Sequence, residues 1–218
     1  MGLTNALHGY VHHRRVRRLG ELLARLIPER AMVLDVGCGD GLLARRIQDL
    51  RPDIQLRGLD VLIREQTHVP VAYFDGHTLP EGDGEADVVM LIDVLHHIQD
   101  PMVLLREAAR VARRAVLIKD HTRDGLFAGL TLRLMDFVGN AHHGVILNYT
   151  YWPKHRWQEA FRELGLTVRA WHDELKLYPG IADRIFGRFL HFVALLEPTH
   201  LMSCTQDVLH RSSPVTAR

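Results

Sequence analysis

The chain has 218 residues, of which 47% are apolar and 24% charged, and its formal net charge is +1. This length and composition fit one α/β domain and exclude a disordered or collagen-like chain. The two cysteines, Cys38 and Cys204, exclude a disulfide framework and a four-cysteine zinc site, and the balanced charge by itself does not indicate nucleic-acid binding.

The predicted elements begin with a helix over residues 4–27. Its apolar residues recur at spacings of three and four, which places one stripe on one face: Val16, Leu19, Leu23 and Leu26. From residue 31 onward, strands and helices alternate, which predicts a parallel sheet with right-handed crossovers. We expect strands at 31–37, 54–61, 69–75, 86–94 and 115–121. We expect helices at 40–50 and 100–114, the second capped by Asp100 and begun by Pro101.

The alternation changes after residue 122. Residues 123–152 form an insertion with a helix at 125–138, whose apolar side carries Phe127, Leu130, Leu134 and Phe137. A further helix is expected at 153–164. Two strands follow at 166–175 and 190–197, and a loop that contains Pro179, Gly180 and Gly187 joins them.

These elements predict a Rossmann-like α/β fold. Its seven-stranded sheet is mostly parallel, has helices on both faces and ends in a C-terminal antiparallel strand pair. We expect a single domain over residues 1–198, in which residues 1–30 form an N-terminal helical region. Residues 199–218 lack periodicity, which is typical of a flexible tail.

The most informative motif is a glycine-rich turn, VLDVGCGDG, at residues 33–41, between the first predicted strand and helix. Glycines let the backbone turn tightly and approach a ligand, and the N–H groups of the following helix face that ligand. A dinucleotide-binding turn has the spacing G-x-G-x-x-G, whereas here it is G-x-G-x-G with Leu42 next. The turn resembles the first motif of class I S-adenosylmethionine (SAM)-dependent methyltransferases, which have an acid where Asp35 stands. The alternative is a turn that only permits close packing of helix and strand.

The resemblance extends over residues 31–121. Asp60 ends the second strand, where the family binds the cofactor ribose, and Asp75-Gly76 ends the third, where the family binds adenine. The fourth strand, ADVVMLIDVLHHI, resembles the fourth family motif, and the small-molecule branch, similar to ubiquinone and menaquinone methylases, fits best. One departure is the segment at residues 111–114, which replaces the usual Pro-Gly-Gly turn. The resemblance implies SAM as cofactor, with S-adenosylhomocysteine as product, bound by Asp35, Gly37, Cys38, Gly39, Gly41, Asp60, Val61, Asp75, Gly76 and Asp93.

Two candidate catalytic residues follow neighbouring strands. His96 lies just past the fourth strand and Asp120 at the end of the fifth, and ligands in such sheets bind beyond these carboxyl ends. A histidine oriented by an aspartate can take the proton of a hydroxyl or activated carbon, so we predict His96 as base and Asp120 as its orienter. Alternatively, the His96-His97 pair only caps the strand and positions the cofactor.

The insertion at residues 123–152 is the candidate acceptor-binding segment, because it follows the fifth strand and mixes polar with aromatic residues. The predicted acceptor-binding residues are Asp136, His143, Tyr149 and Trp152. Two alternatives stay open. One is a metal site formed by His142, His143 and Asp136, although we predict no metal. The other is a helical hairpin without a substrate role.

The first helix carries a basic run, His12–Arg18. A solvated helix face explains it best, peripheral contact with an anionic membrane comes second, and RNA is not expected because no aromatic residues interleave with the charges. No apolar run is long enough to span a membrane and no secretory signal is visible, so we expect a cytoplasmic protein.

Together these observations predict a SAM-dependent methyltransferase that acts on a small organic acceptor, by O- or C-methylation, with in-line displacement at the methyl group. Two alternatives remain. One is another SAM-using reaction on the same fold, and the other is a methyltransferase-like module that binds SAM and supports a partner without turnover.

Overall fold

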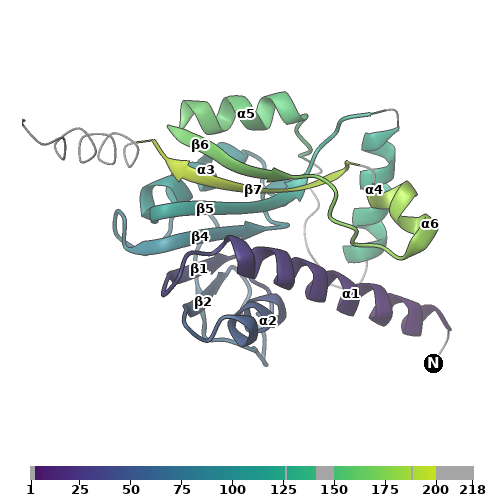
Figure 1. The fold of residues 1–218 in the computed structure, drawn as a ribbon, viewed down its shortest axis with the longest axis horizontal. Helices are drawn as coiled ribbons and strands as arrows, with labels where there is room; N and C mark the ends of the chain where they lie inside the picture. Colours follow the sequence, from purple (N-terminus) through teal and green to yellow (C-terminus); the bar gives the residue numbers. More distant parts are fainter. Residues whose placement is uncertain (1–2, 126, 141–149, 188, 200–218) are drawn as a thin grey trace, which may run out of the picture.

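The structure is a computed structural model that describes residues 3–125, 127–140, 150–187 and 189–199. Its seven strands form one sheet in the order β3-β2-β1-β4-β5-β7-β6 (Figure 1). The strands are β1 (Met32–Val36), β2 (Gln55–Asp60), β3 (Val71–Tyr73), β4 (Ala86–Ile92), β5 (Ala112–His121), β6 (Leu166–His172) and β7 (His191–Pro198). Strands β1 to β5 pair in parallel, and β7 is antiparallel to both β5 and β6. The predicted mostly parallel sheet with an antiparallel C-terminal pair is confirmed.

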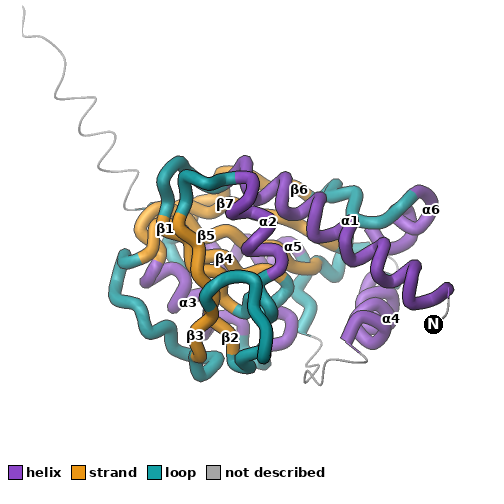
Figure 2. Tube along the Cα trace, turned by 90° about the horizontal axis from the view of Figure 1, so that it is seen from below, coloured by secondary structure: helices purple, strands orange, loops and turns teal. Residues whose placement is uncertain are grey.

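Helices cover both faces of this sheet. They are α1 (Leu3–Leu26), α2 (Leu42–Leu50), α3 (Pro101–Val111), α4 (Ala128–Asn140) and α5 (Lys154–Glu163), with short turns at η1 (Leu95–His97), α6 (Gly180–Ala182) and η2 (Asp183–Gly187). Helices α3 and α5 lie on one face in Figure 1, and Figure 2 views the opposite face, with α1 and α2 in front of the strands. None of the described helices combines the length and apolar content that a membrane crossing requires.

Strand β4 shows why its sequence is a continuous apolar run. Successive side chains of a strand point to opposite faces, and both faces of β4 are covered. Val89 and Leu91 join the core beneath α3 and α5, whereas Val88 and Met90 join the core beneath α1 and α2. Burial on both sides makes β4 and its neighbours a rigid support for the residues that follow their carboxyl ends.

Three details of the predicted elements were wrong. Residues 112–114 were expected to extend α3, but the helix ends at Val111 and β5 begins at Ala112. Ala112 pairs with Ala86 of β4, so the segment joins the sheet, and the Arg113 guanidinium lies 2.6 Å from Asp87. The segment between β6 and β7 was expected to be a loop, yet it contains the helical turns α6 and η2. Strand β3 is shorter than expected because it pairs with β2 over three residues only.

The insertion contains the predicted helix, now α4, but not with the predicted apolar face. Ala128 and Leu132 are buried against Tyr151 and Leu190. Phe127 is exposed, as is Leu130, so the expectation that these two form the packed side was wrong. Among the described side chains of α4, the buried ones therefore face Leu190, which precedes β7, and Tyr151, which follows the insertion. Residues 141–149 of the insertion and 200–218 of the predicted tail lie outside the described residues.

Candidate functional site

The site lies where the connections of the sheet diverge. From β1 the chain proceeds outward to β2 and β3, whereas β4 and β5 extend the sheet the other way, so β1 and β4 are adjacent at the switch point. A cavity of about 260 Å³ opens beyond the carboxyl ends of these two strands. Its lining includes Asp35, Gly37 and Cys38 of the glycine turn, Asp93 after β4, and Arg15 of α1. Ligands of open α/β sheets bind at such a position.

The glycine turn has left-handed backbone angles that favour glycine. Gly37 has φ 74° and Gly39 has φ 61°. A Cβ on Gly37 would lie 2.5 Å from Val94 Cγ2, so this glycine permits close packing of the turn against the chain after β4. By contrast, a Cβ on Gly39 would meet no atom within 4 Å, so this glycine borders open space. Gly41, φ 75°, resembles Gly37, since its Cβ would lie 2.6 Å from Val69 Cγ2.

Two buried carboxyl groups flank the turn. Asp60 Oδ2 accepts a hydrogen bond from Gly39 N at 2.7 Å, and its Oδ1 accepts one from Leu62 N at 2.9 Å. Each oxygen keeps a second lone pair for a ligand hydroxyl. Burial, assisted by repulsion from Asp60, raises the pKa of Asp35 to about 7. A carboxyl group so destabilised in its charged form favours a cationic ligand beside it.

Cys38 has a packing role in this turn. Burial and the charge of Asp35 raise the pKa of its thiol to about 12, so the sulfur stays protonated. A Cβ on Gly58 would overlap Cys38 Sγ, which explains the absence of a side chain at that point of β2. Cys38 therefore contributes shape to the cavity and no nucleophile.

The other predicted cofactor residues lie after β2 and β3. Val61 is exposed and lies over Gly76, because a Cβ on Gly76 would lie 3.2 Å from Val61 Cγ1. Asp75 is exposed, and its Oδ1 accepts hydrogen bonds from His77 N and Thr78 N, which hold its pKa below the usual range. These residues do not line the cavity at the switch point, but they follow β2 and β3 at the same sheet edge.

The predicted pair of His96 and Asp120 is formed. His96 Nδ1 lies 2.8 Å from Asp120 Oδ1, and both side chains are buried. Asp120 also accepts hydrogen bonds from Leu95 N at 3.0 Å and His121 N at 2.7 Å. Burial opposes ionisation of Asp120, but His96 and His121 outweigh it and hold the pKa well below its usual range. The ionised carboxylate therefore places the proton on His96 Nδ1, the ring nitrogen that contacts Asp120.

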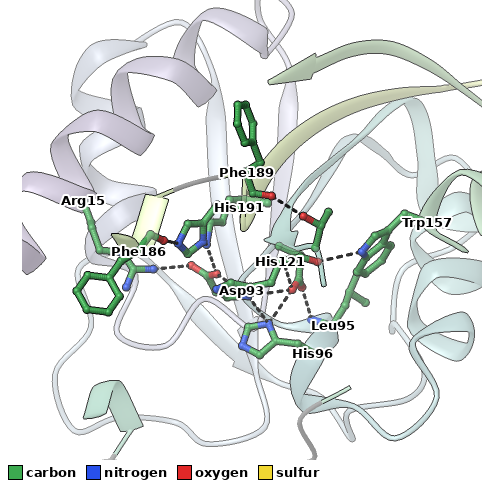
Figure 3. Close-up of polar contacts among 12 residues, drawn as sticks. Arg15, Asp93, Leu95, His96, His121, Trp157, Phe186, Phe189 and His191 are labelled. Atoms are coloured by element: carbon green, nitrogen blue, oxygen red, sulfur yellow. Dashed lines mark hydrogen bonds and ion pairs between the residues drawn. The ribbon is translucent and has the colours of Figure 1, made fainter. Parts of the chain in front are cut away.

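A network of charged and polar side chains connects this pair with the cavity at the switch point (Figure 3). Asp93, at φ 58°, pairs with the fully buried Lys119 and with Arg15 Nη2 at 3.2 Å. Lys119 Nζ also lies 3.3 Å from His191 Nδ1. Burial and the Lys119 charge lower the pKa of His121 to about 4, and the same two causes lower that of His191 well below its usual value. Both histidines are thus neutral near pH 7.

Asp93, His96 and His121 present ligand atoms within 4.8 Å of one another, the described group that most resembles a metal site. Its carboxylate, however, is already paired with the cations of Lys119 and Arg15. A divalent ion there would sit beside two positive charges. We therefore assign this group to a hydrogen-bonded charge network. The alternative set of His142, His143 and Asp136 lies outside the described side chains.

The predicted acceptor residues are only partly described. Asp136 belongs to α4, but its side chain is outside the described part of the structure, as are His143 and Tyr149. Trp152 packs on Trp157 at a ring distance of 4.8 Å, which makes it part of the core under α5. Tyr151, an aromatic residue of the insertion that was not among the predicted acceptor-binding residues, stacks on His96 at 5.9 Å and an interplanar angle of 24°.

Sequence reasoning also missed Arg15 and Lys119. The basic run of α1 is not a uniform solvated face, because Arg15 enters the cavity and Arg14 donates to Lys176 O at 3.3 Å. Arg15 lies four residues before the buried Leu19 and therefore on the same side of the helix. Helical periodicity would thus have predicted that Arg15 faces the sheet. Arg17 and Arg18 are exposed, and membrane contact through them stays a prediction.

A family model described as a methyltransferase domain matches residues 10–170. The chain belongs to the methyltransferase domain family. The glycine turn, Asp60 and the segment after β4 all lie inside the matched residues, so the family inferred from these motifs is confirmed. SAM is the methyl donor that the resemblance to class I enzymes implies.

Two curated relatives are similar to this methyltransferase. The 27-O-demethylrifamycin SV methyltransferase of Amycolatopsis mediterranei is 32% identical over 111 residues, which cover 44% of this chain and 40% of the relative. A ubiquinone biosynthesis O-methyltransferase of Xanthomonas oryzae pv. oryzae is 31% identical over 109 residues, 44% of each chain. The matched part of this methyltransferase spans less than half the length of either relative.

Solved structures share its fold. The magnesium protoporphyrin IX methyltransferase of Synechocystis PCC 6803, determined with bound S-adenosylhomocysteine, superposes with a TM-score of 0.59 at 14% identity. The superposition covers 90% of this chain and 88% of that one. At this identity the likeness concerns the fold, which is the class I methyltransferase arrangement.

Proposed function

We propose that this methyltransferase transfers the methyl group of SAM to a hydroxyl group of a small organic acceptor. The observation that carries the proposal is the cavity at the switch point, bounded by the glycine turn, a carboxyl group of raised pKa and an arginine. SAM supplies a methyl group on a positively charged sulfur, which leaves as a neutral thioether when the methyl is displaced in line.

The residues present fit SAM. The open space at Gly39 permits close approach of a ligand to the backbone. Arg15 brings a cation to the cavity for the carboxylate of the methionine portion, and Asp35 brings an acid for its ammonium group. Asp60 retains lone pairs for the two ribose hydroxyls. The adenine then extends toward Val61, Asp75 and Gly76 beyond β2 and β3.

His96 is proposed as the base. Its proton on Nδ1 is held by Asp120, so the second ring nitrogen can accept the acceptor's proton as the new bond to carbon forms. Asp120 stabilises the imidazolium, which later releases the proton to solvent. The O-methyltransferase names of two relatives support oxygen as the methylated atom, with carbon as the alternative.

Two rival functions are weaker on the same observations. A SAM-binding module that supports a partner without turnover needs the cofactor cavity but not the His96–Asp120 pair, which is buried and fully oriented. Another SAM-using reaction on this fold would also use the cavity. Release of S-adenosylhomocysteine together with a methylated acceptor separates both rivals from the proposal.

The cofactor assignment is tested by calorimetry with SAM and S-adenosylhomocysteine. We expect Asp60→Ala to weaken both by at least about tenfold, because losing a charged hydrogen-bond acceptor costs about 1.5–3 kcal/mol. Asp53→Ala is the matched control, since this aspartate lies in an exposed ion pair with Arg51. Equal affinities of the Asp60→Ala variant and the parent would overturn the assignment, as would tighter binding of NAD than of SAM.

A further inference from the structure

A second cavity, of about 280 Å³, lies beside α4. It is lined by Arg123, Gly129, Leu130, Arg133 and Tyr151, none of which lines the cofactor cavity. Its size is slightly below the usual range of ligand cavities, which is roughly 300–1,000 Å³. Two arginines in so small a cavity make its lining strongly cationic, whereas a neutral acceptor would need a mostly apolar pocket.

The backbone anchors Arg123 at this cavity. Arg123 follows β5 by two residues, and its N–H donates to Trp152 O at 3.0 Å. A Cβ on Gly129 would lie 3.5 Å from Arg123 Cδ, so the arginine side chain passes over the glycine of α4. Arg133 is four residues further along the same helix and therefore on the same side as Gly129. The two guanidinium groups come from different elements but border one space.

Tyr151 connects this cavity with the proposed base. Its ring stacks on His96 at 5.9 Å and meets His121 edge-on at 6.0 Å. His121 Nδ1 lies 3.9 Å from Asp93 Oδ1, and Asp93 lines the cofactor cavity. Contacts through Tyr151, His121 and Asp93 thus link the two cavities, and an acceptor in the second one has to extend its hydroxyl past Tyr151 to meet the methyl group in line.

We propose that the acceptor is a hydroxylated organic acid whose carboxylate binds Arg123 and Arg133. Planar guanidinium groups match a carboxylate with paired hydrogen bonds. Leu130 and the bare backbone at Gly129 contact the apolar body of the acceptor, and Tyr151 directs its hydroxyl toward His96. This assignment of a substrate class rests on the proposed methyl transfer, but the carboxylate site itself is testable by binding alone.

The test compares 4-hydroxybenzoate with its uncharged methyl ester in the protein loaded with S-adenosylhomocysteine, by calorimetry near neutral pH. The acid is expected to bind at least about tenfold more tightly than the ester, as for a charge-assisted contact. Arg123→Gln and Arg133→Gln should each reduce this preference severalfold, and the double variant should abolish it. Arg45→Gln, in an exposed ion pair with Asp49 on α2, is the matched control and should keep the preference.

Several results would overturn the proposal. These are equal binding of acid and ester, no binding of either, and an unchanged preference in the double variant. Tighter binding of phenyl phosphate than of the acid would also overturn it, because the site would then select phosphate. Failure of the parent protein to bind S-adenosylhomocysteine is a different result, since it would remove the proposed function instead. Arg45, Arg123 and Arg133 are all exposed, so we expect each variant to remain folded, which thermal melting checks.

Discussion

Three carboxyl groups of the site, two of them buried and that of Asp93 partly exposed, differ in how their charge is balanced. Asp93 is held ionised by Lys119 and Arg15, and Asp120 by His96 and His121. Asp35 has no such cation among the causes that set its pKa. Burial, assisted by repulsion from Asp60, raises that pKa to about 7. Asp93 and Asp120 are therefore ionised near neutral pH, whereas Asp35 is only partly ionised there.

This difference predicts a pH dependence of cofactor binding. The ionised form of Asp35 attracts the cationic cofactor, and the raised pKa means that this form is lost as the pH falls below about 7. SAM affinity should therefore decrease on acidification, by up to about tenfold per pH unit. Calorimetry between about pH 8 and pH 6 measures the slope. In Asp35→Asn the affinity should be low throughout, and an equally steep slope in that variant would assign the titration to another group.

His96 allows a prediction for the chemical step. If it removes the acceptor's proton, His96→Ala should lower turnover by about 10²–10⁴-fold, the usual contribution of a general base, while SAM affinity is retained. Asp120→Asn should lower turnover less, because orientation is only partly lost. Initial rates of S-adenosylhomocysteine release under saturating SAM give the comparison.

Near-normal turnover of His96→Ala would contradict the base assignment and indicate an acceptor that needs no deprotonation. His155→Ala is a suitable control, since this histidine is exposed on α5. Sequence motifs sufficed to select His96 and Asp120, because both follow neighbouring strands. The motifs did not identify Lys119 as part of the site. Its partners, Asp93 and His191, follow or belong to other strands, and a lysine within an apolar strand gives no sign of these contacts.

At the scale of elements, α5 supports the site from behind. Trp157 is fully buried, and its Nε1 donates to His121 O at 3.0 Å. Its ring packs on Phe192 of β7 at 5.3 Å. The helix therefore holds the end of β5, where Asp120 and His121 lie, through this hydrogen bond, and it holds the neighbouring β7 through the aromatic contact.

Removing this support should destabilise the whole domain. Trp157→Ala should lower the free energy of unfolding by about 3–5 kcal/mol, the typical cost of truncating a buried aromatic side chain. Urea denaturation followed by circular dichroism measures the change. Gln158→Ala, exposed on the same helix, should remain within about 0.5 kcal/mol of the parent. Similar stability of the two variants would mean that α5 is not part of the cooperative core.

The elements themselves were predictable where periodicity is strong. The alternating strands from β1 to β5 and the stripe of α1 follow directly from apolar spacing. The start of β5 was not predictable, because residues 112–114 continue a helical pattern and join the sheet only through pairing with β4, which comes from another part of the chain. The prediction of the packed face of α4 was wrong for a similar reason. The buried residues of this helix pack against Leu190, which lies far along the chain and could not be identified as a partner from the sequence.

At the scale of the whole molecule, the site joins segments from both ends of the chain. α1 contributes Arg15, β4 leads to Asp93, and β7 contributes His191 beside Lys119. In Figure 1, α1 extends from beside β1 toward the side of the molecule where α4 and α6 lie. The mostly parallel sheet, its antiparallel C-terminal pair and the adjacency of β4 and β5 were predicted, but the cofactor cavity depends on how α1 lies across the sheet, which no local pattern specifies.

This arrangement makes cofactor binding a test of how α1 is coupled to the sheet. Arg15 pairs with Asp93 and lines the cavity, so Arg15→Gln should weaken SAM by about tenfold, at the lower end for a charged hydrogen bond because the side chain is one-third exposed. A ligand at 100 times its Kd stabilises a protein by about 2.7 kcal/mol, and a tenfold loss of affinity removes about 1.4 kcal/mol of this. The rise in melting temperature on adding SAM should therefore be about half as large in the variant. Arg17→Gln, exposed on the same helix, should show the full rise, and a full rise in Arg15→Gln would place the cofactor carboxylate elsewhere.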